Sequence, residues 1–124
     1  MNYQIGTVTL HSRDKNRMLD FLSDVMEFDV DQSNNSVTHG PFIFQVNEGA
    51  ISSSGVEFTF SLKSEEDLQE ILRKYHFFHY RKPGNDLFVE KLQMSEVDCK
   101  KILTIEDIDQ RKWRFELLKK ITEL

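Results

Sequence analysis

The sequence predicts an α+β fold in which two β-α-β-β-β modules pair into one curved, mostly antiparallel sheet with the helices outside. The first observation is a repeat, because the strand-helix-strand pattern of residues 5–30 returns fifty residues later over about 25 residues. The second is that the final predicted strand of each copy alternates apolar and polar residues in the same way. The third is a stretch of small and polar residues, 47–55, which lies between the copies.

The first copy begins with an alternating stretch, residues 4–10, in which Val8 and Leu10 share one face. Asp14 is placed to cap the following helix with its carboxylate. The apolar stripe of that helix comprises Met18, Phe21, Leu22, Val25 and Met26. Three short strands are predicted after the helix, at residues 28–31, 36–39 and 42–46. A turn at 32–36 and the pair Gly40-Pro41 separate them.

The second copy follows the same order with a longer loop before its last two strands. Ser64 is placed to cap a helix that runs to about Lys74. The strands predicted around this helix are 56–62, 76–81, 101–106 and 112–118, with 87–94 as an additional strand or an ordered loop. The offset grows to 71 in the last strand, where Phe42, Phe44 and Val46 correspond to Trp113, Phe115 and Leu117. We therefore expect a first module at 1–48, a linker at 49–55 and a second module at 56–124.

Composition narrows the possible partners and the cellular compartment. The 124 residues carry a formal charge of −5 with acidic and basic residues interspersed, which argues against nucleic acid and anionic membranes as partners. No apolar stretch approaches the length of a membrane span. The single cysteine, Cys99, cannot form an internal disulfide, and the N-terminus has no secretory pattern. We expect a cytoplasmic protein.

The faces turned away from the helices carry the candidate site. The repeat superposes Thr7 on Glu57 and Gln45 on Glu116, and a pseudo-twofold would bring these four positions together. Arg114 lies on the same face. The further residues expected to line this ligand cavity are Thr9, His11, Ile43 and Thr59.

Several local stretches, in this order, resemble the vicinal oxygen chelate superfamily, the fold of glyoxalases, bleomycin resistance proteins and extradiol dioxygenases. They are Ile5-Gly6-Thr7-Val8-Thr9-Leu10 followed by residues 14–21, then Val25-Met26-Glu27-Phe28-Asp29-Val30, then residues 107–117. The last stretch is similar to the Asp-Pro-Asp-Gly turn of that family and the Glu-Leu after it, without the Pro and Gly. The resemblance implies a single glyoxalase-like domain over residues 1–124.

Metal-dependent members of that superfamily take ligands from four strand positions, which the resemblance carries onto Thr7, Gln45, Glu57 and Glu116. Thr7 stands where the family commonly has His, and a hydroxyl is a poor ligand for a transition metal. The implied metal ligands are therefore Glu57, Glu116 and Gln45, with Glu116 the first candidate for a catalytic role. Two other readings of the carboxylates stay open. One of them can pair with Arg114 or face water, or the two can repel each other and raise one pKa, which would make a general base.

We therefore expect a glyoxalase-like protein that binds a small molecule in the concave sheet without an intact metal site. No cofactor is required in this reading, although a divalent metal is possible. One alternative is a metal-dependent lyase, isomerase or dioxygenase of the same superfamily, with the ion acting as a Lewis acid. Another is a non-catalytic interaction module, for example one that forms a homodimer.

Overall fold

The computed structural model describes residues 7–31, 33–49, 57–81 and 90–118. The chain divides into two compact units, Met1–Ser52 and Ser53–Leu124. Residues 50–55 of the predicted linker lie outside the described residues. None of the described helices is long and apolar enough to cross a membrane.

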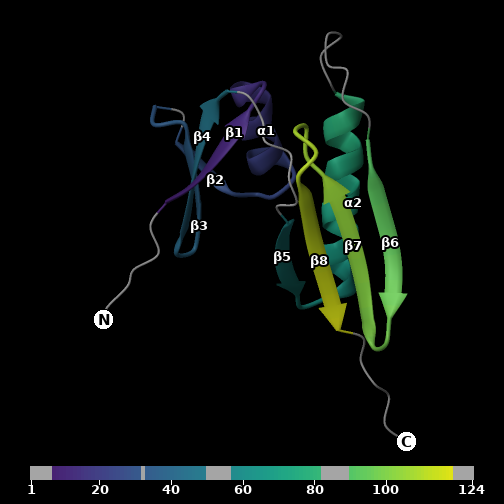
Figure 1. Ribbon diagram of the computed structural model, residues 1–124. Helices are drawn as coiled ribbons and strands as arrows, with labels where there is room; N and C mark the ends of the chain where they lie inside the picture. The colour runs from purple at the N-terminus through teal and green to yellow at the C-terminus, as the bar shows by residue number, and fades with distance from the viewer. Residues whose placement is uncertain (1–6, 32, 50–56, 82–89, 119–124) are drawn as a thin grey trace, which may run out of the picture. The chain divides into compact units, whose positions relative to one another are not determined.

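The first unit has the predicted β-α-β-β-β order (Figure 1). Its elements are β1 (Thr7–Ser12), α1 (Lys15–Asp24), β2 (Asp29–Asp31), β3 (Ser36–His39) and β4 (Phe42–Glu48). The sheet order is β1-β4-β3-β2, with β1 parallel to β4 and the other pairs antiparallel. Asp14 caps α1, as predicted, because its Oδ1 accepts a hydrogen bond from the Arg17 amide at 3.1 Å. The predicted stripe residues Met18, Phe21 and Leu22 are fully buried.

The second unit repeats this topology (Figure 1). Its elements are β5 (Glu57–Leu62), α2 (Glu65–Tyr80), β6 (Leu92–Val97), β7 (Lys100–Glu106) and β8 (Lys112–Leu118). The sheet order is β5-β8-β7-β6, again with one parallel pair, β5 with β8. Trp113 lies in the core and stacks on Phe58, with 4.5 Å between the ring centroids. The α+β class and the two β-α-β-β-β modules are thus confirmed.

The predicted strand at 76–81 is wrong, because α2 continues to Tyr80. Tyr75, Phe78 and His79 are buried at a spacing of three and four residues, which is one face of a helix. The second strand of this unit is β6, which overlaps only partly with the predicted stretch 87–94, and 87–89 lie outside the described residues. Cys99 is exposed at the turn between β6 and β7.

The strand register also corrects the correspondence between the two copies. Val8 lies opposite Phe44, and its repeat equivalent Phe58 lies opposite Trp113. Phe44 therefore corresponds to Trp113, an offset of 69 residues instead of 71. The counterpart of Gln45 is consequently Arg114, and Glu116 lies two residues further along β8.

Candidate functional site

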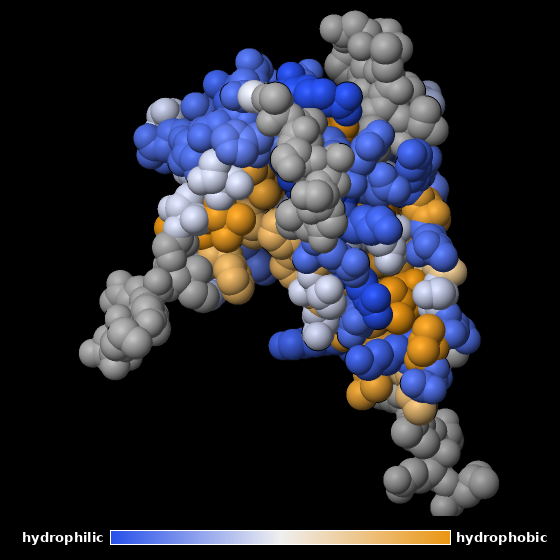
Figure 2. Space-filling model, in the orientation of Figure 1, coloured by the Kyte–Doolittle hydropathy of each residue, from blue (hydrophilic) through white to orange (hydrophobic). Residues whose placement is uncertain are grey.

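One side of the second sheet is free of helix, and we call it the open face. Along β8 the side chains of Trp113, Phe115 and Leu117 are buried on the α2 side, and the alternate residues point to the open face. Figure 1 shows α2 behind β6, β7 and β8, so the viewer looks onto the open face. In the same orientation, Figure 2 shows mostly hydrophilic residues there, with hydrophobic ones toward the lower end.

Four charged residues form a line across the open face, and we call them the charged row. Glu57 on β5 lies opposite Lys112 on β8, and Lys112 lies opposite Glu106 on β7. Lys91, directly before β6, continues the line, because its carbonyl accepts a hydrogen bond of 3.1 Å from the Glu106 amide. The charges alternate in sign from one strand to the next, an arrangement that stabilises neighbouring strands.

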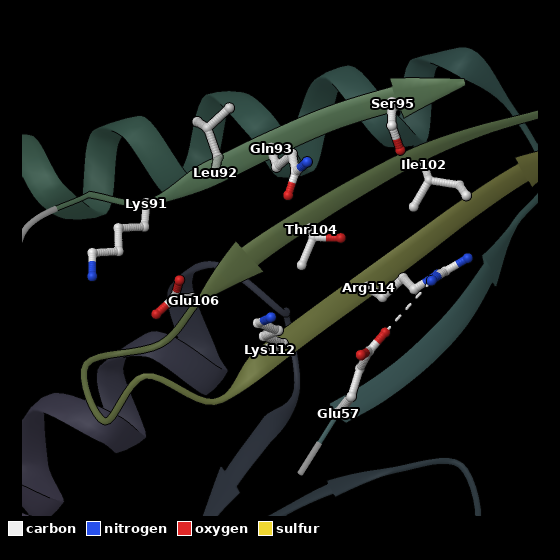
Figure 3. Close-up of a pocket in the computed structure, with 10 residues that line it drawn as sticks. All are labelled: Glu57, Lys91, Leu92, Gln93, Ser95, Ile102, Thr104, Glu106, Lys112 and Arg114. Carbon is white, nitrogen blue, oxygen red and sulfur yellow. Dashed lines mark ion pairs between the residues drawn. The ribbon is translucent and has the colours of Figure 1, made fainter. Parts of the chain in front are cut away.

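A pocket of about 410 Å³ opens over the charged row (Figure 3). Its lining comprises the charged row and Leu92, Gln93, Ser95, Ile102, Thr104 and Arg114. The lysines of the charged row are exposed at its rim, whereas Thr104, Glu106 and Arg114 are half-buried and Ile102 is buried. The pocket thus combines charges of both signs with hydroxyl and amide groups, which suits a small polar molecule.

A buried tyrosine holds one end of the charged row from the helix side. The Tyr75 hydroxyl lies 2.7 Å from the Glu106 carbonyl and 3.0 Å from the Lys91 carbonyl, and it accepts a hydrogen bond from the Lys91 amide at 3.1 Å. Burial raises the pKa of Tyr75, so the hydroxyl keeps its proton for one of the carbonyls. Tyr75 therefore fixes the backbone of two pocket residues at once.

A buried aspartate holds the connection between β7 and β8. Asp107 Oδ1 accepts from the amides of Asp109 at 2.8 Å and Arg111 at 3.0 Å, and its Oδ2 accepts from the Trp113 indole at 2.9 Å. Burial raises the pKa of Asp107, and the hydrogen bond from Trp113 and the charge of Arg111 oppose that rise. Gln110 closes the turn with a φ of 67°, at the position of the Gly in the Asp-Pro-Asp-Gly pattern. This turn fixes the spacing of Glu106 and Lys112.

Arg114 joins the two carboxylates that the sequence singled out. Its Nη1 lies 3.7 Å from Glu57 Oε1, and its Nε donates to Glu116 Oε2 at 2.9 Å. Glu116 also accepts from Lys100 Nζ at 3.2 Å. That hydrogen bond, together with the charges of Lys100 and Arg114, lowers the pKa of Glu116. Glu116 is therefore ionised and paired, and its catalytic role stays a prediction.

The residues present do not fit a metal ion held by Glu57 and Glu116. A guanidinium stands between the two carboxylates, and a second cation at that place would be repelled by Arg114 and would compete with it for the same oxygens. In the strand register Glu57 lies opposite Lys112, which is four residues from Glu116 on β8. The positions of Glu57 and Glu116 are therefore about 13 Å apart along the strands. In the part of the chain that the structure describes, no three His, Cys, Asp or Glu side chains gather closely enough to hold a metal.

All but one of the remaining predicted site residues lie on the first unit. Thr7, Thr9 and His11 are exposed on β1, and Ile43 and Gln45 alternate with buried residues on β4. Gln45 Nε2 donates to the Asn34 carbonyl at 2.7 Å, which ties the side chain to the β2–β3 turn. Thr59 lies on β5, opposite Arg114. The structure thus brings Glu57, Thr59, Arg114 and Glu116 together within one unit, and the other five share a face of the first unit.

Sequence reasoning missed three charged residues of the pocket: Lys91, Glu106 and Lys112. A partial signal was present, since Glu106 and Lys112 are the end residues of predicted strands and flank the turn of the Asp-Pro-Asp-Gly type. Lys91 carries no such signal, because its place depends on the pairing of β6 with β7.

Comparison with solved structures identifies the fold. A glyoxalase/bleomycin resistance protein/dioxygenase family enzyme from Burkholderia phytofirmans PsJN matches with a TM-score of 0.72 at 13% identity, over 94% of this chain and 99% of that chain. The fosfomycin resistance protein FosX from Mesorhizobium loti matches at 0.67 and 13% identity, over 98% and 96%. A lactoylglutathione lyase from Agrobacterium tumefaciens matches at 0.63 and 10% identity, over 94% of each chain. No family model and no curated protein matches the sequence.

Proposed function

We propose that this chain, which has the vicinal oxygen chelate fold, binds a small polar molecule in the pocket on its open face, without a metal ion. We keep the interpretation as a glyoxalase-like protein. We do not keep the alternative of a metal-dependent lyase, isomerase or dioxygenase, because the residues around Arg114 do not fit a metal ion. A fold does not fix an activity, so the proposal rests on the pocket itself.

The observation that carries the proposal is the position of Arg114. In the register it is the counterpart of Gln45, and its guanidinium occupies the space between Glu57 and Glu116. A fixed cation there can be held by two carboxylates and still present donors to a ligand, since a guanidinium has five N–H groups. Binding would then rely on ionic hydrogen bonds, and no Lewis acid is needed.

The first test measures the melting temperature with and without metal ions. A metal ion that binds only the folded state would raise the melting temperature. We expect equimolar Ni²⁺, Mn²⁺ or Zn²⁺ to leave the melting temperature unchanged, because the proposed site binds none of them. A clear rise that disappears in Glu116→Ala would overturn the metal-free proposal.

The second test looks for the ligand. A library of polar fragments is screened by amide chemical-shift changes in the ¹⁵N-labelled protein, and we expect changes at Thr104, Gln93 and their neighbours. Arg114→Ala should weaken the response, whereas Arg73→Ala, which removes the same charge from an exposed site on α2, should not. A screen in which no fragment shifts the amides around the pocket would refute ligand binding there.

A second candidate function is self-association through the edge of the second sheet. β6 is an edge strand of six residues, and Leu92, Met94 and Val97 on it are exposed. Exposed edges with apolar side chains pair readily with another chain. We propose a homodimer as the form this would take, and light scattering after size-exclusion chromatography tests it, with Met94→Lys expected to restore a monomer.

The cytoplasmic location remains part of the proposal. It rests on the single cysteine, which is exposed and has no second cysteine in the chain to pair with. Fractionation of cells that express the tagged full chain tests it, and recovery from a secreted fraction would contradict it.

A further inference from the structure

We infer that the ligand of this pocket is a small carboxylic acid that also carries a hydrogen-bond donor, with its carboxylate held by Lys91 and Lys112 and its donor by Glu106. The inference rests on the proposed function, since it specifies what the same pocket binds. It starts from the charged row, because that row places two ammonium groups on either side of one carboxylate (Figure 3).

The two lysines differ from their basic neighbours in their ion pairs. Lys100 pairs with Glu116, Lys101 with Glu65, and Arg114 with two carboxylates. No ion pair joins Lys91 or Lys112 to an acidic side chain within the described ranges, although both lie beside Glu106. Two cations of the pocket are therefore open to an anion from solution.

The spacing of the strands allows both lysines to reach one anionic group. Lys112 on β8 and Lys91 beside β6 are separated by β7, so their backbones lie two strand spacings apart, or about 10 Å. A lysine side chain is a flexible four-carbon stem with three donor protons at its end. Two such stems can meet over Glu106, where an oxyanion would accept from both.

The charge balance favours one negative charge on the ligand. Glu57 and Glu116 pair with Arg114, and Glu116 pairs also with Lys100, so these four side chains are neutral together. The rest of the charged row, Lys91, Lys112 and Glu106, has a net charge of +1. A doubly charged phosphate would bring more negative charge next to Glu106 than the two lysines offset. A carboxylate brings one, and a hydroxyl or ammonium group on the same molecule can donate to Glu106, which is half-buried at the floor.

The pocket is preorganised for such a ligand by groups beneath it. Tyr75 holds the backbones of Lys91 and Glu106, and the Asp107 turn holds Glu106 next to Lys112. Both Tyr75 and Asp107 are fully buried. The backbones that carry the charged row therefore keep their spacing without a ligand, which lowers the ordering cost of binding.

The test uses acids and their uncharged counterparts on the ¹⁵N-labelled full chain. Lactate and glycolate are titrated beside lactamide and glycolamide, with inorganic phosphate as a separate probe, and the amide shifts of Gln93, Thr104 and Lys112 are followed. We expect the two acids to shift these backbone amide signals, and this response should fall as salt is added. The neutral carboxamides and phosphate should shift the same signals at least tenfold more weakly. Lys91→Gln and Lys112→Gln should each weaken the acid response about tenfold, as expected for loss of one charged hydrogen bond.

Arg73→Gln is the matched control, because it removes a positive charge from α2 on the other side of the sheet and should leave the response unchanged. Equal responses to acids and neutral amides, a stronger response to phosphate, or an undiminished acid response in Lys112→Gln would each overturn the inference while ligand binding stands. If neither these probes nor the polar fragments shift any amide of the pocket, the proposed function fails as well.

Discussion

Replacing Tyr75 by Phe removes one oxygen atom from the core of the second unit and leaves the ring in place. That oxygen accepts from the Lys91 amide and donates to one of two carbonyls, those of Glu106 and Lys91, at any time. Two hydrogen bonds are lost, each worth about 1 kcal/mol net, and the Lys91 amide, whose bond to Tyr75 is partly buried, loses its partner. We therefore expect Tyr75→Phe to lower the free energy of unfolding by about 1.5–3 kcal/mol.

The assay is urea unfolding followed by the fluorescence of Trp113, the only tryptophan of the chain, which is fully buried in the same unit. For a slope of about 2 kcal/mol per molar urea, the midpoint should fall by about 1 M with the slope unchanged. Tyr80→Phe is the matched control, because Tyr80 lies on the same helix and is 86% exposed. A midpoint for Tyr75→Phe within error of that control would refute the view that Tyr75 holds β6 and β7 together.

Three further variants probe the β7–β8 turn and the Arg114 cluster by the same urea assay. Asp107→Asn should lower the free energy of unfolding by about 2–4 kcal/mol, because every partner of the carboxylate is a hydrogen-bond donor and the new NH₂ group would face one of them. A loss smaller than that of Asp98→Asn, at an exposed position, would contradict this. Gln110→Gly should stabilise the protein by about 0.5–1 kcal/mol, since glycine adopts a φ of 67° without steric cost, and an unchanged midpoint would argue against strain there. The lowered pKa of Glu116 means that its ionised form stabilises the fold above the ordinary glutamate range and that this contribution is lost as the pH falls through the folded value. The destabilisation caused by Glu116→Gln should therefore be present at about pH 7 and shrink as the pH falls below the ordinary glutamate range, and a difference that stays constant in acid would speak against the ionic origin.

Local signals were sufficient to predict most of the first unit. Asp14 caps the helix, the stripe from Met18 to Val25 is buried, and the strands alternate as expected, because each of these features depends on residues close in sequence. In the second unit the repeat misled where local periodicity was ambiguous. The run His76–Tyr80 is apolar enough for a strand, but Tyr75, Phe78 and His79 bury one helical face instead, and the next strand begins only at Leu92.

The sequence predicted correctly which face of the sheet carries Arg114 and Glu116, but it matched the wrong residue of β8 to Gln45. An error of two residues in register preserves the alternation of a strand, so Glu116 and Arg114 both point to the open face as expected. Which of them pairs with Glu57 depends on how β5 and β8 are aligned, and no pattern within either strand fixes that alignment. For the same reason the approach of Lys91 to Glu106 could not be foreseen, since it arises from pairing between β6 and β7 and from a hydroxyl on α2.

The exposed thiol at the β6–β7 turn has a practical consequence for every measurement of oligomeric state. Two molecules can become covalently linked through Cys99 in air, and such a species would elute at twice the monomer mass without any native interface. The same strand end carries the exposed apolar side chain of Val97, so an oxidised pair and a true edge-to-edge pair would look alike by size alone. Reductant, or a Cys99→Ser variant, separates the two, and only association that survives both belongs to the fold.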